Sequence, residues 1–372
     1  MWIMNSEFPF PLYYLGLLII TVFLSRFVFR RYIGFAKRYN LVKSTNARAA
    51  HKGLVFTGGG VVYAAVIMVA AVVLDNLDFV EFAVLSPVIG TSILIAVLGF
   101  YDDFTEISAF HKYIILTFLI SMLVYSFYLS DSGFDIISNL NGFLGIYELS
   151  SILSFVFTCF VYLSIMNAIN LTDGIDGYLA IFSIFFFISF LYMNDINDFY
   201  TLNSISAIII ASSAIFLRYN FSKKGKKLFV GDAGSLFIGF WMAYFLIQYI
   251  STAPSAKLVD VFSIKLENIP VIAISLISIP VLDTLRVMLV RISNRKSPFT
   301  ADTNHLHHIL LNSGMTHLRT SLFLTFINCF NCVVIFLVEP NFNSKELTLI
   351  YIAISLAWYV FFEYMNRKNI SS

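Results

Sequence analysis

The sequence predicts an all-α fold, a polytopic membrane helix bundle of about eleven transmembrane helices. Three observations support it: an apolar composition, eleven long apolar stretches, and basic residues gathered in alternate loops. Of the 372 residues, 59% are hydrophobic and 12% are charged, whereas a typical soluble domain is about a quarter charged. This composition fits a bilayer and excludes a soluble globular fold. The net charge of +2 gives no indication of a nucleic-acid partner.

Each apolar stretch is long enough to cross a bilayer, which takes about 20 mainly apolar residues. The first is followed by basic residues, so we expect a retained helix rather than a cleaved leader. No soluble domain or internal repeat interrupts the series, so we expect one membrane domain over residues 1–372. The stretches lie near 11–30, 58–74, 82–100, 111–130, 149–168, 177–193, 201–218, 234–250, 269–290, 320–338 and 347–364.

The basic residues predict the orientation. Eleven spans divide the loops into two sets, and all Lys and Arg residues except Lys257, Lys265 and Lys345 fall in one set or at the adjoining helix ends. Because basic loops remain on the cytoplasmic side, that set is predicted to be cytoplasmic. The N-terminus is then outside and the C-terminus is cytoplasmic.

Two pairs of carboxylates lie at the ends of predicted spans on the cytoplasmic face. Asp102 and Asp103 end the third stretch, and neighbours on a helix point about 100° apart, so we expect them to have different roles. Asp173 and Asp176, in NAINLTDGIDG, would share a face if helical. The alternative is that Thr172 or Asp173 caps the sixth helix. Ionisable groups at the edge of a membrane bundle indicate a functional site.

A third acidic motif, FVGDAGSLFIGF, opens the eighth stretch at residues 229–240. The N-terminus of a helix favours anions, and Mg²⁺ prefers carboxylate and phosphate oxygens as ligands. Asp232 at this position is therefore expected to hold Mg²⁺ beside a phosphate. The alternative is that Asp232 is only the N-cap of the helix.

The loop at residues 296–310 contains His305, His307 and His308. The first and last are three residues apart and would share a face if helical. Three neutral imidazoles could bind zinc or hydrogen-bond to phosphate, but the carboxylates elsewhere suit Mg²⁺ better. His317, in the same loop, is interpreted as a bystander.

Other polar residues of the cytoplasmic face are weaker candidates. Asn46, Arg48 and His51 follow the first span, and the glycines at 58–60 then open the second. Those glycines permit close helix packing, which is as good an explanation as binding. The remaining candidate carboxylates in or beside the predicted cytoplasmic loops are Glu106, Asp283 and Asp302.

In chain order, the motifs DD, NxxNxTDGxDG, GDxGSxxxGF, PxxDTxR and SPFxxDxxHxHH resemble the polyprenyl-phosphate N-acetylhexosamine-1-phosphate transferases, of the glycosyltransferase 4 type. The resemblance covers about residues 40–310 and is strongest to the undecaprenyl-phosphate GlcNAc-1-phosphate transferase branch. It implies a multi-pass enzyme of the bacterial inner membrane with a cytoplasmic active site. Such an enzyme transfers GlcNAc-1-phosphate from UDP-GlcNAc to undecaprenyl phosphate, releases UMP and starts a lipid-linked cell-envelope glycan, such as that of lipopolysaccharide O-antigen.

Three alternatives stay open. They are the same reaction with another UDP-N-acetylhexosamine, the same reaction with phospho-MurNAc-pentapeptide, and, remotely, a membrane transporter. The oligomeric state is also open, with a homodimer as one alternative. Besides its two substrates, the protein is expected to contact membrane lipid.

The resemblance also implies a role for each candidate residue. Asp232 and Asp103 would bind Mg²⁺, with Mn²⁺ as the alternative, and Phe229 would stack on uracil. The catalytic residues would be Asp102, Asp103, Asp173, Asp176, His305, His307 and His308. The substrate-binding residues would be Asn170, Asn220, Phe229, Gly234, Ser235 and Arg286.

Overall fold

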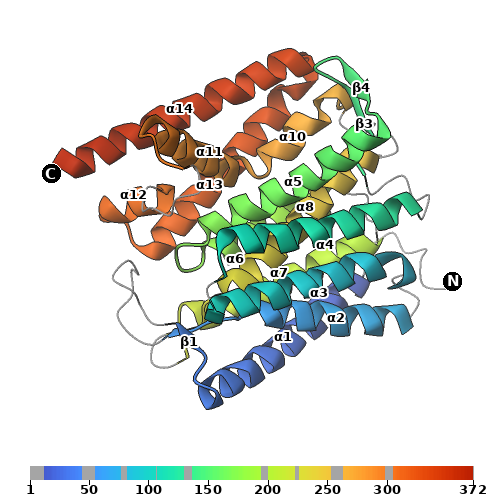
Figure 1. The fold of residues 1–372 in the computed structure, drawn as a ribbon, viewed down its shortest axis with the longest axis vertical. Helices are drawn as coiled ribbons and strands as arrows, with labels where there is room; N and C mark the ends of the chain where they lie inside the picture. Colours follow the sequence, from blue (N-terminus) through green and yellow to red (C-terminus); the bar gives the residue numbers. More distant parts are fainter. Residues whose placement is uncertain are drawn as a thin grey trace. The chain divides into compact units, whose positions relative to one another are not determined.

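The computed structural model describes residues 12–43, 55–76, 82–105, 107–129, 136–193, 200–222, 226–252, 263–297 and 305–371. Most of these residues are helical (Figure 1), which confirms the predicted all-α class. The strands of this part of the chain form two small antiparallel pairs: β1 (Val42–Lys43) with β2 (Val55–Phe56), and β3 (Asn139–Phe143) with β4 (Ile146–Glu148).

The chain folds into two compact units. Unit 1 comprises Met1–Glu106 and Phe187–Phe237, and unit 2 comprises Ile107–Phe186 and Ile238–Ser372. Two of the three boundaries fall within helices, α6 (Tyr178–Met193) and α8 (Gly231–Thr252), so each of these helices contributes residues to both units. The expected single domain over residues 1–372 stays a prediction.

Unit 1 is built on α1, which packs against α7 and α2, while α2 also packs against α3 and α7. Side-chain hydroxyls join these apolar helices: Ser25 Oγ lies 3.0 Å from Ser212 Oγ, and Tyr63 OH donates to Ser213 Oγ at 3.3 Å. Such bonds between helices satisfy polar groups that a bilayer would not. The helices of unit 1 are α1 (Leu12–Arg38), α2 (Gly60–Asn76), α3 (Phe82–Thr105) and α7 (Tyr200–Asn220).

In unit 2, α5 packs against α4 and α11, and α13 packs against α10, α11, α12 and α14. The 3-10 turns η2 (Leu266–Asn268) and η3 (Glu339–Asn341) precede α10 and α14. The helices of unit 2 are α4 (Ala109–Leu129), α5 (Ser151–Thr172), α10 (Ile269–Ser275), α11 (Ser278–Ser293), α12 (Leu306–Asn312), α13 (His317–Val338) and α14 (Ser344–Ser371).

Among the described residues, eight helices are long and apolar enough to cross a membrane, or up to nine if one bent pair counts as a span. Two shorter apolar helices, α2 and α6, coincide with the stretches predicted near 58–74 and 177–193. The multi-pass architecture is therefore confirmed, whereas the count of eleven stays a prediction. The apolar window of α14 is only 11% buried, as expected for a helix that faces lipid.

The span predicted near 269–290 is not one continuous helix: α10 and α11 are separate helices that meet at an angle of 72°, and a crossing by the pair as one broken span stays a prediction. Pro280, near the start of α11, has no N–H to donate to the preceding turn. Asn328 of α13 compensates: its Nδ2 donates to Leu276 O at 2.8 Å, and its Oδ1 accepts from Ile279 N–H at 2.9 Å. The broken backbone is thus satisfied by an amide from a neighbouring helix.

Candidate functional site

The site in unit 1 is organised around the start of α8. Asp103, near the end of α3, accepts a hydrogen bond on Oδ1 from the backbone N–H of Asp232 at 3.0 Å. Gly231 precedes Asp232 with φ of +71°, and a Cβ at Gly231 would lie 2.1 Å from Asp103 Oδ2. Glycine is therefore required here both for its backbone conformation and for the close approach of the carboxylate.

Two interpretations of the acidic motifs can be compared with this geometry. The N-cap alternative for Asp232 is wrong, because α8 begins at Gly231 and Asp232 lies inside its first turn. The adjacent acids have different environments, since Asp103 is buried and Asp102 is partly exposed, and different roles for them stay a prediction. The carboxylate that occupies the start of α8 is thus supplied by α3.

Small residues allow α2 and α3 to approach the same turn of α8. A Cβ at Gly60 would lie 1.9 Å from the backbone nitrogen of Gly234, and a Cβ at Gly99 would lie 2.5 Å from that of Ala233. Ser235, which is buried, donates its hydroxyl to Gly231 O at 3.2 Å within the helix. Close packing thus explains Gly234, and an intrahelical hydrogen bond engages Ser235; substrate binding by either residue stays a prediction.

The segment before α8 is held by α7 and by the glycine-rich segment before α2. Asn220 is buried, and its Nδ2 donates to Leu228 O at 3.0 Å. The backbone of Phe229 is bonded on both sides, to Phe56 O at 2.8 Å and from Gly59 N–H at 3.0 Å. Its ring is partly exposed, with Lys227 Nζ 5.4 Å from the ring centre. An accessible aromatic ring on a hydrogen-bonded backbone is compatible with the predicted stacking on a base.

In unit 2, Asp173 and Asp176 lie in the turn between α5 and α6. The capping alternative for α6 is wrong: Thr172 ends α5, Asp173 is the C-cap of α5, and α6 begins only at Tyr178. The two acids therefore do not share a helical face. Asn170, in the last turn of α5, is partly exposed, and its carbonyl accepts from Asp173 N–H at 3.3 Å.

The turn is tied to α13 through Asp176. The backbone N–H of Asp176 donates to His317 Nδ1 at 3.3 Å, and Ser321 Oγ donates to Asp176 O at 2.8 Å. The ring of His317, interpreted as a bystander, therefore supports the acidic turn, while its lack of a part in the chemistry stays a prediction. The sequence carries no signal for this contact, because 141 residues separate the partners.

The histidine segment lies against the same turn. His305 is the N-cap residue of α12 and not part of the helix, so it does not share a helical face with His308. The rings of His305 and His307 stack with centroids 5.7 Å apart and an interplanar angle of 8°. A Cβ at Gly174 would lie 2.1 Å from His307 Nε2, so the absence of a side chain allows the imidazole to lie on the turn.

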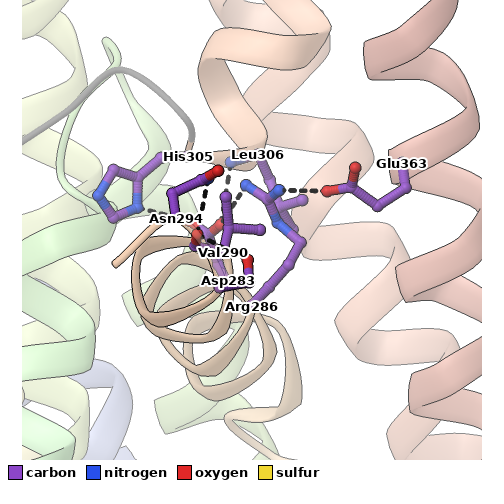
Figure 2. A network of polar contacts seen from close by, with 8 residues as sticks. Asp283, Arg286, Val290, Asn294, His305, Leu306 and Glu363 are labelled. Carbon is purple, nitrogen blue, oxygen red and sulfur yellow. Dashed lines mark hydrogen bonds and ion pairs between the residues drawn. The ribbon is translucent and has the colours of Figure 1, made fainter. Parts of the chain in front are cut away.

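Arg286, expected to bind substrate, is buried in an ion pair instead. Its Nη1 lies 2.8 Å from Glu363 Oε1, and its Nη2 lies 3.5 Å from Asp283 Oδ1 (Figure 2). Asp283 also contacts His305. Glu363 was missed as a site residue, and Asp283 was only a weak candidate without an assigned role, although PxxDTxR places Asp283 and Arg286 one helical turn apart. A direct substrate contact by Arg286 stays a prediction.

Some candidates lie outside the described residues. They are Asn46, Arg48 and His51 of the first connection, and Glu106 and Asp302.

The donor atoms suit Mg²⁺ better than zinc. Among the described residues, no three His, Cys, Asp or Glu side chains are grouped so that they could hold a metal ion by themselves. Zinc normally takes three or four protein ligands, whereas Mg²⁺ is often bound by one or two carboxylates together with phosphate oxygens and water. Asp103, whose carboxylate accepts the backbone N–H of Asp232 at the start of α8, and Asp232 itself would suit that second pattern.

His307 is buried as a neutral ring. Burial, and then the nearby His308, lower the pKa of His307 to about 3. In the unfolded chain a histidine titrates near pH 6.5. Below that pH the unfolded chain binds a proton that the folded chain does not bind until about pH 3. The contribution of the buried His307 ring to the stability of the fold is therefore complete above about pH 6.5 and is lost as the pH falls towards 3.

We predict that acidification from pH 7 to pH 5 costs about 2 kcal/mol of stability through His307. The Tm of the purified protein should therefore fall more between these pH values than the Tm of His307→Gln. His111→Gln is the matched control, because His111 is exposed on α4 and its loss should leave the fall unchanged. Equal falls in the wild type and in His307→Gln would contradict the prediction.

Residues 84–250 match the family model of glycosyl transferase family 4. Over 303 residues the chain is 31% identical to the probable undecaprenyl-phosphate N-acetylglucosaminyl 1-phosphate transferase of Bacillus subtilis (strain 168). The aligned residues make up 82% of this chain and 76% of that relative. It is 30% identical over 298 residues to the undecaprenyl-phosphate alpha-N-acetylglucosaminyl 1-phosphate transferase of Escherichia coli (strain K12), covering 78% of this chain and 74% of the relative.

A third relative is the decaprenyl-phosphate N-acetylglucosaminephosphotransferase of Mycobacterium leprae (strain TN), 32% identical over 196 residues, with 49% of this chain and 47% of the relative covered. The family model lies on the segment that carries the DD, TDGxDG and GDxGS motifs. Identity at this level over three quarters of the first two relatives shows common descent. With its multi-pass helical fold, the chain belongs to glycosyl transferase family 4.

Proposed function

We propose that the protein transfers N-acetylhexosamine 1-phosphate, with GlcNAc 1-phosphate as first choice, from a UDP-sugar to undecaprenyl phosphate and releases UMP. The relatives' names support the transferred group and the polyprenyl acceptor. The resemblance in the motifs supports the UDP donor. The lipid-linked product would start a cell-envelope glycan at the cytoplasmic face of a bacterial inner membrane.

The reaction balances without another source of energy. An oxygen of the lipid phosphate forms a bond to the phosphorus nearest the sugar. The bond between that phosphorus and the bridging oxygen of UDP breaks, and UMP leaves with the electron pair. One phosphoanhydride replaces another, so catalysis requires positioning and neutralisation of charge rather than chemical activation.

The structural observation that carries the proposal is the contact between Asp103 and the N–H of Asp232 at the start of α8. It brings two acidic residues to one helix end, where Mg²⁺ would find carboxylate oxygens. When bound there, the ion would supply the positive charge that diphosphate and lipid phosphate need in order to approach. Because Asp103 already occupies the N–H of Asp232, we expect this acidic pair to act on phosphate through the metal rather than through that N–H.

The remaining roles are assigned by environment within each unit. Asp102, partly exposed beside the buried Asp103, is proposed as the base that accepts the proton of the lipid phosphate. In unit 2, the stacked rings of His305 and His307 and the turn of Asp173 and Asp176 are proposed to contact the sugar nucleotide. The donor would be held by groups whose positions the hydrogen bonds of His317 and Ser321 fix.

A transfer assay tests the function. We predict that purified full-length protein with Mg²⁺, undecaprenyl phosphate and sugar-labelled UDP-GlcNAc moves label into the organic phase and releases an equal amount of UMP. Omission of the lipid phosphate is the control and should abolish both. If a panel of UDP-N-acetylhexosamines gave no lipid-linked product, the proposed function would be wrong.

A second test concerns the metal. We predict that EDTA abolishes transfer and that Mg²⁺ or Mn²⁺ restores it. Asp232→Asn should lose about a thousandfold in kcat, because the amide keeps the shape of the side chain but removes its charge. Glu148→Gln, the same change at an exposed position of β4, should retain wild-type kcat. Full transfer by Asp232→Asn in EDTA would refute the metal assignment.

The orientation is a further part of the proposal, with eleven spans, the N-terminus outside and the C-terminus cytoplasmic. The test uses intact cells that express the protein without its three native cysteines. We predict that Tyr147→Cys in β4 then reacts with an impermeant maleimide and that Asn294→Cys, after α11, does not. Both positions are exposed, so access to the reagent depends on the side of the membrane. Permeabilised cells are the control, in which both should react. The reverse labelling would overturn the topology and the cytoplasmic site.

A further inference from the structure

A chain of ionisable side chains in unit 2 leads from α14 to the histidine segment (Figure 2). Glu363 of α14 pairs with Arg286 of α11 at 2.8 Å. Arg286 lies 3.5 Å from Asp283, one turn earlier on α11. Asp283 Oδ2 in turn lies 3.0 Å from Nδ1 of His305. Four side chains from three parts of the sequence thus form one continuous polar path.

Asp283 uses both of its carboxylate oxygens on the histidine segment. Oδ2 faces His305 Nδ1, and Oδ1 accepts the backbone N–H of Leu306 at 3.0 Å. An ionised carboxylate only accepts hydrogen bonds, so Nδ1 of His305 must carry the proton. In the neutral ring, Nε2 is then the acceptor, and the tautomer of His305 is defined by its partner.

The same carboxylate also begins α12. His305 is the N-cap residue of that helix but makes no side-chain capping bond of its own. The N–H of Leu306 is one of the first amides of the helix, which have no partner within the helix. Asp283 supplies that partner from α11, so it fixes the position of the segment and the orientation of the ring together.

Arg286 and Glu363 explain how Asp283 can be charged at this position. Asp283 is 2% exposed, Arg286 1% and His305 6%. A buried carboxylate without a cation is unfavourable, whereas a hydrogen-bonded pair is tolerated. Glu363, whose side chain is 22% exposed, pairs with the other end of the guanidinium and limits its movement. Arg286 is therefore engaged on both sides by carboxylates of the protein.

The orientation of His305 is transmitted to the acidic turn. Its ring stacks on His307, and His307 lies against Gly174, between Asp173 and Asp176. A rotated or differently protonated His305 would change the position and the hydrogen-bonding groups of the stacked rings at this turn.

We propose that Asp283, held by Arg286 and Glu363, is a positioning residue that fixes the tautomer of His305 and the start of α12. The proposal deepens the transferase function and rests on it as far as catalysis is concerned. Asp283 acts through His305 and needs no contact of its own with either substrate.

The decisive variant is Asp283→Asn. Its amide oxygen can still accept the N–H of Leu306, so the start of α12 is kept. Its NH₂ group would face His305 Nδ1 as a donor, so the proton of the ring must move to Nε2. We expect kcat/KM for the UDP-sugar to fall about 10–100-fold, while KM for undecaprenyl phosphate stays unchanged. Asp283→Glu, which restores the charge, should recover part of the loss.

A double-mutant cycle distinguishes positioning from simple stabilisation. In the His305→Gln background, Asp283→Asn should cause no further loss, because its effect passes through the missing ring. Glu363→Gln, which keeps an acceptor for Arg286, should give a smaller loss that also disappears in this background. Glu346→Gln, the same change at the exposed start of α14, is the matched control and should keep wild-type kinetics. Independent losses that add in the double variants would overturn the proposal.

The tautomer can be read without any substrate. In protein labelled with ¹⁵N-histidine, the signal of His305, assigned with His305→Gln, should indicate an Nδ1–H ring in the wild type and an Nε2–H ring in Asp283→Asn. If Asp283→Asn does not fold, Glu363→Gln and its cycle with His305→Gln decide the matter. An unchanged tautomer in folded Asp283→Asn would refute the positioning role. Failure of the wild type to make lipid-linked product would refute the transferase function instead.

Discussion

The structure depends on one constraint: a helix that ends within an apolar bundle must find partners for its terminal N–H and C=O groups. The described part of the chain meets it three times with a side chain from another helix. Asp103 of α3 accepts an N–H at the start of α8, Asp283 of α11 accepts the N–H at the start of α12, and Asn328 of α13 bonds to the ends of both α10 and α11. Each of these contacts determines where a helix begins.

Two of these three side chains are carboxylates at the candidate site, so fold and chemistry share residues. Asp103 both holds the first turn of α8 and brings an acid next to Asp232. Asp283 both holds α12 and orients His305. A residue with two such functions cannot be studied by alanine alone, because removal of the side chain leaves an unsatisfied backbone group as well as a missing charge. An amide of the same shape separates the two effects.

The sequence was sufficient to place most of the long helices and the acidic motifs, because both are local properties. Asp102, Asp103 and Asp232 lie at helix ends, as the apolar stretches predicted. Partnerships across the chain could not be predicted in this way: Arg286 and Glu363 are separated by 77 residues, and Leu276 and Asn328 by 52. The break after Ser275 was missed because neither Leu276 nor Ile277 is a helix breaker, and because Pro280 comes only after α11 has begun. The alternative that Thr172 or Asp173 caps α6 was wrong because both residue types are common at helix ends. The sequence does not distinguish the end of α5 from the start of α6.

The bend between α10 and α11 has a consequence for biogenesis. The seven residues of α10 are too few to span a bilayer, and within the described part of the chain the carbonyl of Leu276 accepts its hydrogen bond from Asn328. A ribosome that adds about 5–20 residues per second reaches Asn328 roughly 3–10 s after it has made the break. During that interval Asn328 has not yet been made, so its bonds to the carbonyl of Leu276 and the N–H of Ile279 cannot form. Stable insertion of α10 and α11 must therefore wait for α13, so this part of the chain enters the membrane as a group of helices rather than one span at a time.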